Sequence, residues 1–133
     1  MTIRIVLDAS AAANIVMRTD SATRLIDKLE NTALVMAPEL FHSEIANTMW
    51  KYVRAGDLDT PAAIDRYEEA ISLIDTFEAD KRLITEALSS ASKYNHPVYD
   101  MMYAVLARRY GCSILSMDKR LIVLLQKIDI DLA

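Results

Sequence analysis

Four acidic residues have the type and placement to bind a divalent cation together. Asp8 directly follows the apolar run at residues 3–7, and Asp118 directly follows the run at residues 114–117. Glu44 and Asp100 lie near the starts of two predicted helices. In a parallel sheet flanked by helices, strands end and the following helices begin at the same edge, where ligands bind. We therefore expect these four carboxylates to converge.

Clustered carboxylates repel one another and have raised pKa values unless a cation joins them. An all-oxygen donor set suits Mg²⁺ or Mn²⁺. With one cysteine and two histidines, the chain has too few soft ligands for a thiolate zinc site or a site of several imidazoles. For any single acid, the alternative is a helix cap or a solvated surface residue.

Apolar runs and helical patterns alternate along the whole chain. Strands are expected at residues 3–7, 33–37, 71–77, 112–117 and 128–132. Helices are expected from Ser10, over 21–30, over 41–55, from Thr60, over 81–94, over 99–110, and from Asp118 to 127. Residues 71–77 fit either a helix end or a strand, and we take them as a strand. The pattern predicts an α/β fold of three layers, with a central, mostly parallel sheet of about five strands and helices on both faces.

Length and composition fit one domain over residues 1–133. Of the 133 residues, 53% are apolar and 26% are charged. Only two glycines are present, which excludes glycine-rich phosphate-binding loops. The apolar run near the N-terminus is too short for a secretion signal or a membrane span. We expect a cytoplasmic protein without a membrane partner.

The net charge of −4 is unevenly distributed. Residues 57–86 hold nine acidic and three basic residues, so no broad basic face is evident. Individual cations could still contact a phosphate. Lys119 and Arg120 follow Asp118 directly, and Lys51 shares a helix face with Glu44 and Asn47.

The stretches around the four acids resemble, in order, the motifs of PIN-domain ribonucleases, most closely the VapC-type toxins of toxin–antitoxin modules. Residues 5–11 resemble the opening strand with its Asp-x-Ser, and residues 37–47 resemble the second motif. Residues 99–107 read Tyr-Asp-x-x-Tyr-x-x-Leu-Ala, and residues 115–121 resemble the fourth motif. Ser116 stands where the family commonly has Thr. The resemblance covers essentially the whole chain.

This resemblance implies that Asp8, Glu44, Asp100 and Asp118 are catalytic and hold one or two Mg²⁺ or Mn²⁺ ions, supported by Ser10 and Ser116. Such ions activate a water that attacks an RNA phosphodiester. The implied partners are RNA and an antitoxin protein, which could place an arginine among the carboxylates. We also expect a homodimer, because the apolar content is high for a small domain and exposed apolar patches usually mark interfaces.

Two asparagines are candidates for supporting roles on spacing alone. Asn47 lies three residues after Glu44 on a predicted helix, and Asn14 lies four residues after Ser10. Asn47 could hydrogen-bond the carboxylates or the RNA backbone, or be part of a solvated polar stripe. For Asn14 we favor a supporting role over that of a surface helix residue.

Three other classes of protein share parts of this pattern. A phosphorylated receiver would have paired acids after its first strand, but Leu7 and Ala9 flank Asp8. A haloacid-dehalogenase-type phosphatase would have Asp-x-Asp, but Ser10 takes the second place. A PIN-like scaffold that only binds protein would not need the four acids, although it could keep them.

Overall fold

The computed structural model describes residues 3–133, and its center is a parallel sheet with the strand order β3-β2-β1-β4. The strands are β1 (Arg4–Leu7), β2 (Leu34–Pro38), β3 (Thr76–Glu78) and β4 (Ser113–Leu115). Residues 1–2 of the expected domain lie outside the described part of the chain. The predicted class, an α/β fold with a parallel sheet and helices on both faces, is confirmed.

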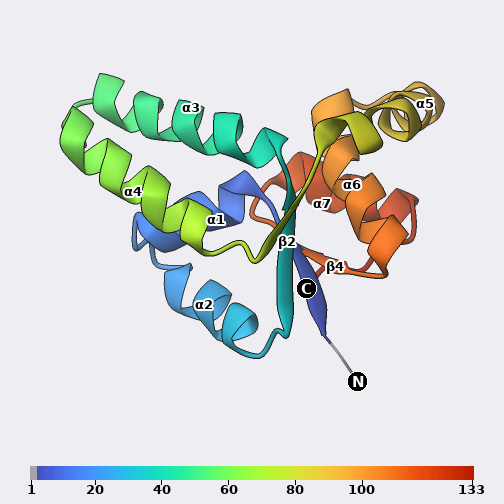
Figure 1. Cartoon of the computed structure of the whole chain (residues 1–133), viewed down its shortest axis with the longest axis horizontal. Helices are drawn as coiled ribbons and strands as arrows, with labels where there is room; N and C mark the ends of the chain where they lie inside the picture. The colour runs from blue at the N-terminus through green and yellow to red at the C-terminus, as the bar shows by residue number, and fades with distance from the viewer. Residues whose placement is uncertain (1–2) are drawn as a thin grey trace.

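The helices form a layer on each face of the sheet (Figure 1). One layer holds α1 (Ala9–Val16), α2 (Ala22–Glu30), α3 (Leu40–Arg54) and α4 (Thr60–Ser72). The other holds α5 (Ile84–Tyr94), preceded by the short 3₁₀ helix η1 (Asp80–Arg82), with α6 (Val98–Tyr110) and α7 (Lys119–Lys127). No helix in residues 3–133 is long and apolar enough to cross a membrane.

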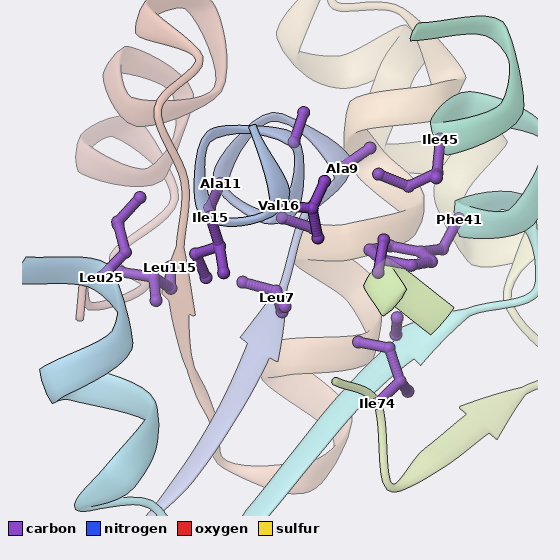
Figure 2. Packing of buried hydrophobic residues seen from close by; sticks show 14 of the residues in the cluster. Leu7, Ala9, Ala11, Ile15, Val16, Leu25, Phe41, Ile45, Ile74 and Leu115 are labelled. Atoms are coloured by element: carbon purple, nitrogen blue, oxygen red, sulfur yellow. The ribbon is translucent and has the colours of Figure 1, made fainter. Parts of the chain in front are cut away.

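Each layer packs on the sheet through its own apolar core. In the first, Leu7 and Leu115 of the sheet meet Ile15, Phe41 and Ile45 of the helices (Figure 2). In the second, α6 is buried along residues 101–107 and packs between the sheet, α5 and α7. Alternate residues of the β1 strand enter opposite cores, since Leu7 belongs to the first and Val6 to the second. Both layers therefore hold β1 and β4 rigidly where the acids follow them.

The prediction of a fifth strand at residues 128–132 is wrong. Only Leu132 pairs with the sheet, through a single bridge to Ile114. Asp129 adopts a left-handed backbone conformation after α7, with a φ of 60°. This turn leaves only the last residues of the chain to meet β4.

The segment at residues 71–77, which the sequence allows as a helix end or a strand, contains part of each. Helix α4 continues to Ser72, and the strand begins only at Thr76. Asp75 makes the junction, because its carboxylate accepts a hydrogen bond from the Val35 amide at 2.8 Å while its own amide donates to the Val35 carbonyl.

Candidate metal and active site

The four acids line one hollow at the edge of the sheet where its strands end. This pocket has a volume of about 290 Å³. Its walls come from the end of β1 and from α1, α3, α6 and the start of α7, and they include Asp8, Glu44, Asp100 and Asp118. The predicted convergence of four carboxylates from separate elements is therefore present.

Asp8 is the most buried of the four, with 4% of its surface exposed. Its carboxylate accepts hydrogen bonds from the Ser10 hydroxyl at 2.8 Å, the Ser116 hydroxyl at 2.5 Å and the Ala11 amide at 2.9 Å. The last bond makes Asp8 the N-cap of α1, so the helix begins at Ala9, one residue before the expected start at Ser10. Burial raises the pKa of Asp8 to about 6, although the three hydrogen bonds lower it.

Glu44 projects from α3 and is held by a tyrosine from α6. The Tyr103 hydroxyl donates to Glu44 Oε1 at 2.5 Å. Burial raises the pKa of the Glu44 carboxyl to about 7, the Tyr103 bond lowers it, and the charges of Asp8, Asp100 and Asp118 raise it further. Burial also raises the pKa of Tyr103, so its phenol keeps the proton that it donates.

Asp100 and Asp118 are more accessible to solvent than Asp8 and are engaged by other groups. His96, which precedes α6, is four residues before Asp100, and its Nε2 lies 2.7 Å from Asp100 Oδ2. Asp118 is the N-cap of α7 and accepts a hydrogen bond from the Arg120 amide at 2.9 Å. His96 is not among the site residues expected from the sequence. Its spacing of four residues from Asp100 was the signal that it could reach the site.

The predicted supporting residues do not all reach the pocket. Ser10 and Asn47 line it, while Ser116 is buried behind it against Asp8. Asn14 does not line the pocket. Its amide donates to the Ser10 carbonyl at 2.8 Å, and its oxygen accepts from the Thr19 hydroxyl at 2.7 Å.

The three predicted cations lie on two sides of the carboxylates. Lys51 lines the pocket beside Glu44 and Asn47, as the helical spacing predicts. Lys119 and Arg120 instead line a neighboring hollow with His96. The cations therefore flank the acids on the side of α3 and on the side of α7.

The four carboxylates supply oxygen ligands, which suit a hard divalent cation. They are also close enough for the charges of Asp8, Asp100 and Asp118 to raise the pKa of Glu44. Within residues 3–133, however, no three acidic, histidine or cysteine side chains are gathered closely enough to ligate one ion as they stand. Each carboxylate is turned toward a donor of the protein: Ser116 for Asp8, Tyr103 for Glu44, His96 for Asp100 and the α7 amides for Asp118. Binding an ion would require side-chain rotation within the pocket.

Comparison with known proteins agrees with this architecture. The sequence profile of the PIN domain matches residues 5–125. This chain belongs to the PIN-domain family. It is 30% identical to Ribonuclease VapC3 of Pyrobaculum aerophilum, over 89% of this chain and 92% of that protein.

Two solved structures share the PIN fold of this chain. PAE2754 from Pyrobaculum aerophilum superposes with a TM-score of 0.72 at 24% identity, over 92% of this chain and 85% of that one. VapC20 of Mycobacterium tuberculosis, described as a sarcin-ricin loop cleaving toxin, superposes with a TM-score of 0.64 at 16% identity, over 90% of this chain and 94% of that one. The predicted resemblance to VapC-type PIN domains is confirmed.

Proposed function

We propose that this PIN-domain protein is a metal-dependent endoribonuclease and the toxin of a type II toxin–antitoxin module, formed by a single domain over residues 1–133. The observation that carries the proposal is the convergence of Asp8, Glu44, Asp100 and Asp118 on one pocket from separate elements. The likeness to Ribonuclease VapC3 supports an RNA substrate.

The four carboxylates would hold one or two Mg²⁺ or Mn²⁺ ions. PIN-domain ribonucleases generally use divalent metals. Such an ion supplies an activated water and stabilizes charge on the phosphodiester during hydrolysis. Ser10 and Ser116 orient Asp8, Tyr103 orients Glu44, and Asn47 lines the same wall as Glu44. Asn14 acts more remotely, by fixing the backbone of Ser10.

The basic residues explain how an acidic pocket attracts RNA. The carboxylates repel phosphate, so the substrate must be drawn by cations at the rim and by bound metal. Lys51 would contact the strand on the α3 side, and Lys119 and Arg120 on the α7 side. Within residues 3–133, none of the three has an acidic side chain within ion-pair distance.

We also propose a homodimer and a cognate antitoxin as partners. An apolar hollow of about 330 Å³ lies between α3 and α4, where Trp50 and Ile64 are each about half exposed. Exposed apolar surface of this kind is typical of protein interfaces. The antitoxin would cover the carboxylate pocket and place an arginine there, as the negative charge favors. A cytoplasmic location stays a prediction.

The deciding experiment is cleavage of total RNA by the purified protein, with sequencing of the new ends. We expect cleavage with Mg²⁺ or Mn²⁺, none in excess EDTA, and none with Asp8→Asn. Asp65→Asn on α4 is the matched control and should cleave like the wild type. Full activity in EDTA would reject the metal mechanism. Absence of cleavage under every metal condition, with antitoxin binding intact, would favor the silent scaffold.

A further inference from the structure

A second hollow lies beside the carboxylate pocket, on the α7 side. It has a volume of about 330 Å³ and is lined by His96, Lys119, Arg120 and Val123. The hollow is shallow and open to solvent. None of the four acids lines it, and neither do Ser10, Ser116 and Tyr103.

The hollow and the carboxylate pocket share a wall. His96 lines the hollow, and its Nε2 lies 2.7 Å from Asp100 Oδ2, which lines the pocket. On the other side, Lys119 of the hollow directly follows Asp118 of the pocket. A polymer whose phosphate lies among the acids would therefore pass over this hollow with its adjacent unit.

The side chains around the hollow match the two parts of a nucleotide. Its surface is mostly apolar, with the exposed side of Val123 and the imidazole ring of His96, and such surfaces pack against a nucleobase. Lys119 and Arg120 are exposed at its rim, and neither has an acidic partner in residues 3–133. Their charges can reach the phosphates on either side of a bound base.

From these contacts we infer that this hollow is a nucleotide-binding subsite, which takes the base of a nucleotide adjacent to the cleaved phosphodiester. The inference rests on the proposed function, because it takes RNA to be the polymer. A base can enter such a hollow only when it is unpaired and unstacked. The subsite therefore selects single-stranded RNA, loops or bulges over continuous duplex.

Filling the hollow provides a test that does not depend on catalysis. Val123 is 51% exposed on α7, so Val123→Trp can occupy the hollow without disturbing the core. Ile84 is 45% exposed on α5 and outside the hollow, so Ile84→Trp is the matched control. Circular dichroism and thermal melting would establish that both variants fold.

The probe is a fluorescein-labeled, single-stranded RNA octamer of mixed sequence, with binding followed by anisotropy in EDTA so that no cleavage occurs. We expect Val123→Trp to weaken binding by about tenfold, as loss of one stacked base would, and Ile84→Trp to leave it unchanged. An octamer with an abasic unit at each position in turn should bind the wild type more weakly at one position. Val123→Trp should lose that discrimination.

Two results would overturn the subsite. Wild-type affinity of a folded Val123→Trp variant would show that RNA does not use the hollow. An abasic scan with equal effects in the wild type and in Val123→Trp would show that no base enters it. The proposed nuclease is tested separately, because these binding results can be positive in a protein that cleaves nothing.

Discussion

Asp8 and Asp118 follow neighboring parallel strands, yet the structure gives them different surroundings. Leu7 pairs with Leu115, so the residue in register with Asp8 is Ser116, and Asp118 comes two residues later. Asp8 is 4% exposed and accepts three hydrogen bonds, whereas Asp118 is partly exposed and caps α7.

Position after a strand therefore does not set how deeply a carboxylate is buried or how many hydrogen bonds it accepts. Burial raises the pKa of Asp8 to about 6, so it ionizes at a cost that a bound cation would offset. Solvent and the amides at the start of α7 stabilize the charge of Asp118. Asp8 is therefore the inner acid, whose charge the proposed metal would stabilize, and Asp118 is the outer acid, which is also the N-cap of α7.

Catalysis should show the largest difference between the two acids. We expect Asp8→Asn to lower kcat/KM by about 10³-fold, which corresponds to losing several kcal/mol of transition-state stabilization by metal. Asp118→Asn should cost less, about 10²-fold, because solvent screens the charge of an exposed ligand. Initial rates on a labeled RNA in Mn²⁺ would measure both. Equal losses would remove the distinction between inner and outer acid.

The pH dependence of stability tests the burial of Asp8 in a second way. The ordinary pKa of Asp8 is 3.8 and its value in the folded protein is about 6, so between these values the folded protein binds more protons than the unfolded chain. The free energy of unfolding should therefore fall as pH rises through this window, by about 3 kcal/mol in total from Asp8.

Urea unfolding in EDTA between pH 4 and pH 8 would measure this contribution as the difference between the wild type and Asp8→Asn. The variant should lack the part of the fall that comes from Asp8 and keep the part that comes from Glu44, whose pKa is raised to about 7. Saturating Mn²⁺ should largely remove the fall from the wild type at pH 8. Parallel pH profiles of the two proteins would contradict the buried, destabilized charge at Asp8.

The capping role of Asp118 predicts a smaller effect on stability. Asp118→Ala removes the acceptor for the first amides of α7 and should cost about 1 kcal/mol, whereas Asp118→Asn keeps a capping oxygen and should cost a few tenths. Thermal unfolding of the two variants at pH 7 would measure this difference. If the Asn variant loses as much as the Ala variant, the charge of Asp118 rather than its cap stabilizes α7.

The smallest predicted effect concerns the cations that follow the outer acid. Lys119→Ala with Arg120→Ala should weaken RNA binding and reduce the salt slope by up to about 1.4, at about 0.7 per phosphate contact on a single strand. Arg108→Ala with Arg109→Ala is the control, since both arginines lie 3.7 Å from Glu86 and are already paired. Binding titrations at several salt concentrations would give the slopes. A larger change in the control would show that RNA contacts Arg108 and Arg109 rather than Lys119 and Arg120.

Much of the fold and the identity of the four acids could be predicted from the sequence. Apolar runs alternating with helical patterns require a parallel sheet covered on both faces, and Gly111 ends α6 with a φ of 65°, as its position predicts. Glu44, Asn47 and Lys51 share one pocket wall because a helix repeats every 3.6 residues. These features depend on local sequence alone.

The properties of each acid depended on the tertiary structure. The register of β1 against β4 placed Ser116 against Asp8, and no local pattern states which residues of two distant strands face each other. The arrangement of the two helical layers around the sheet brought Tyr103 of α6 to Glu44 of α3, 59 residues away. The turn before α6 brought His96 to Asp100, although a loop histidine has many possible orientations. The four carboxylates could be named from the sequence, whereas the burial that raises the pKa of Asp8 and Glu44 and the hydrogen bonds that lower it could not, because they depend on residues far apart in the chain.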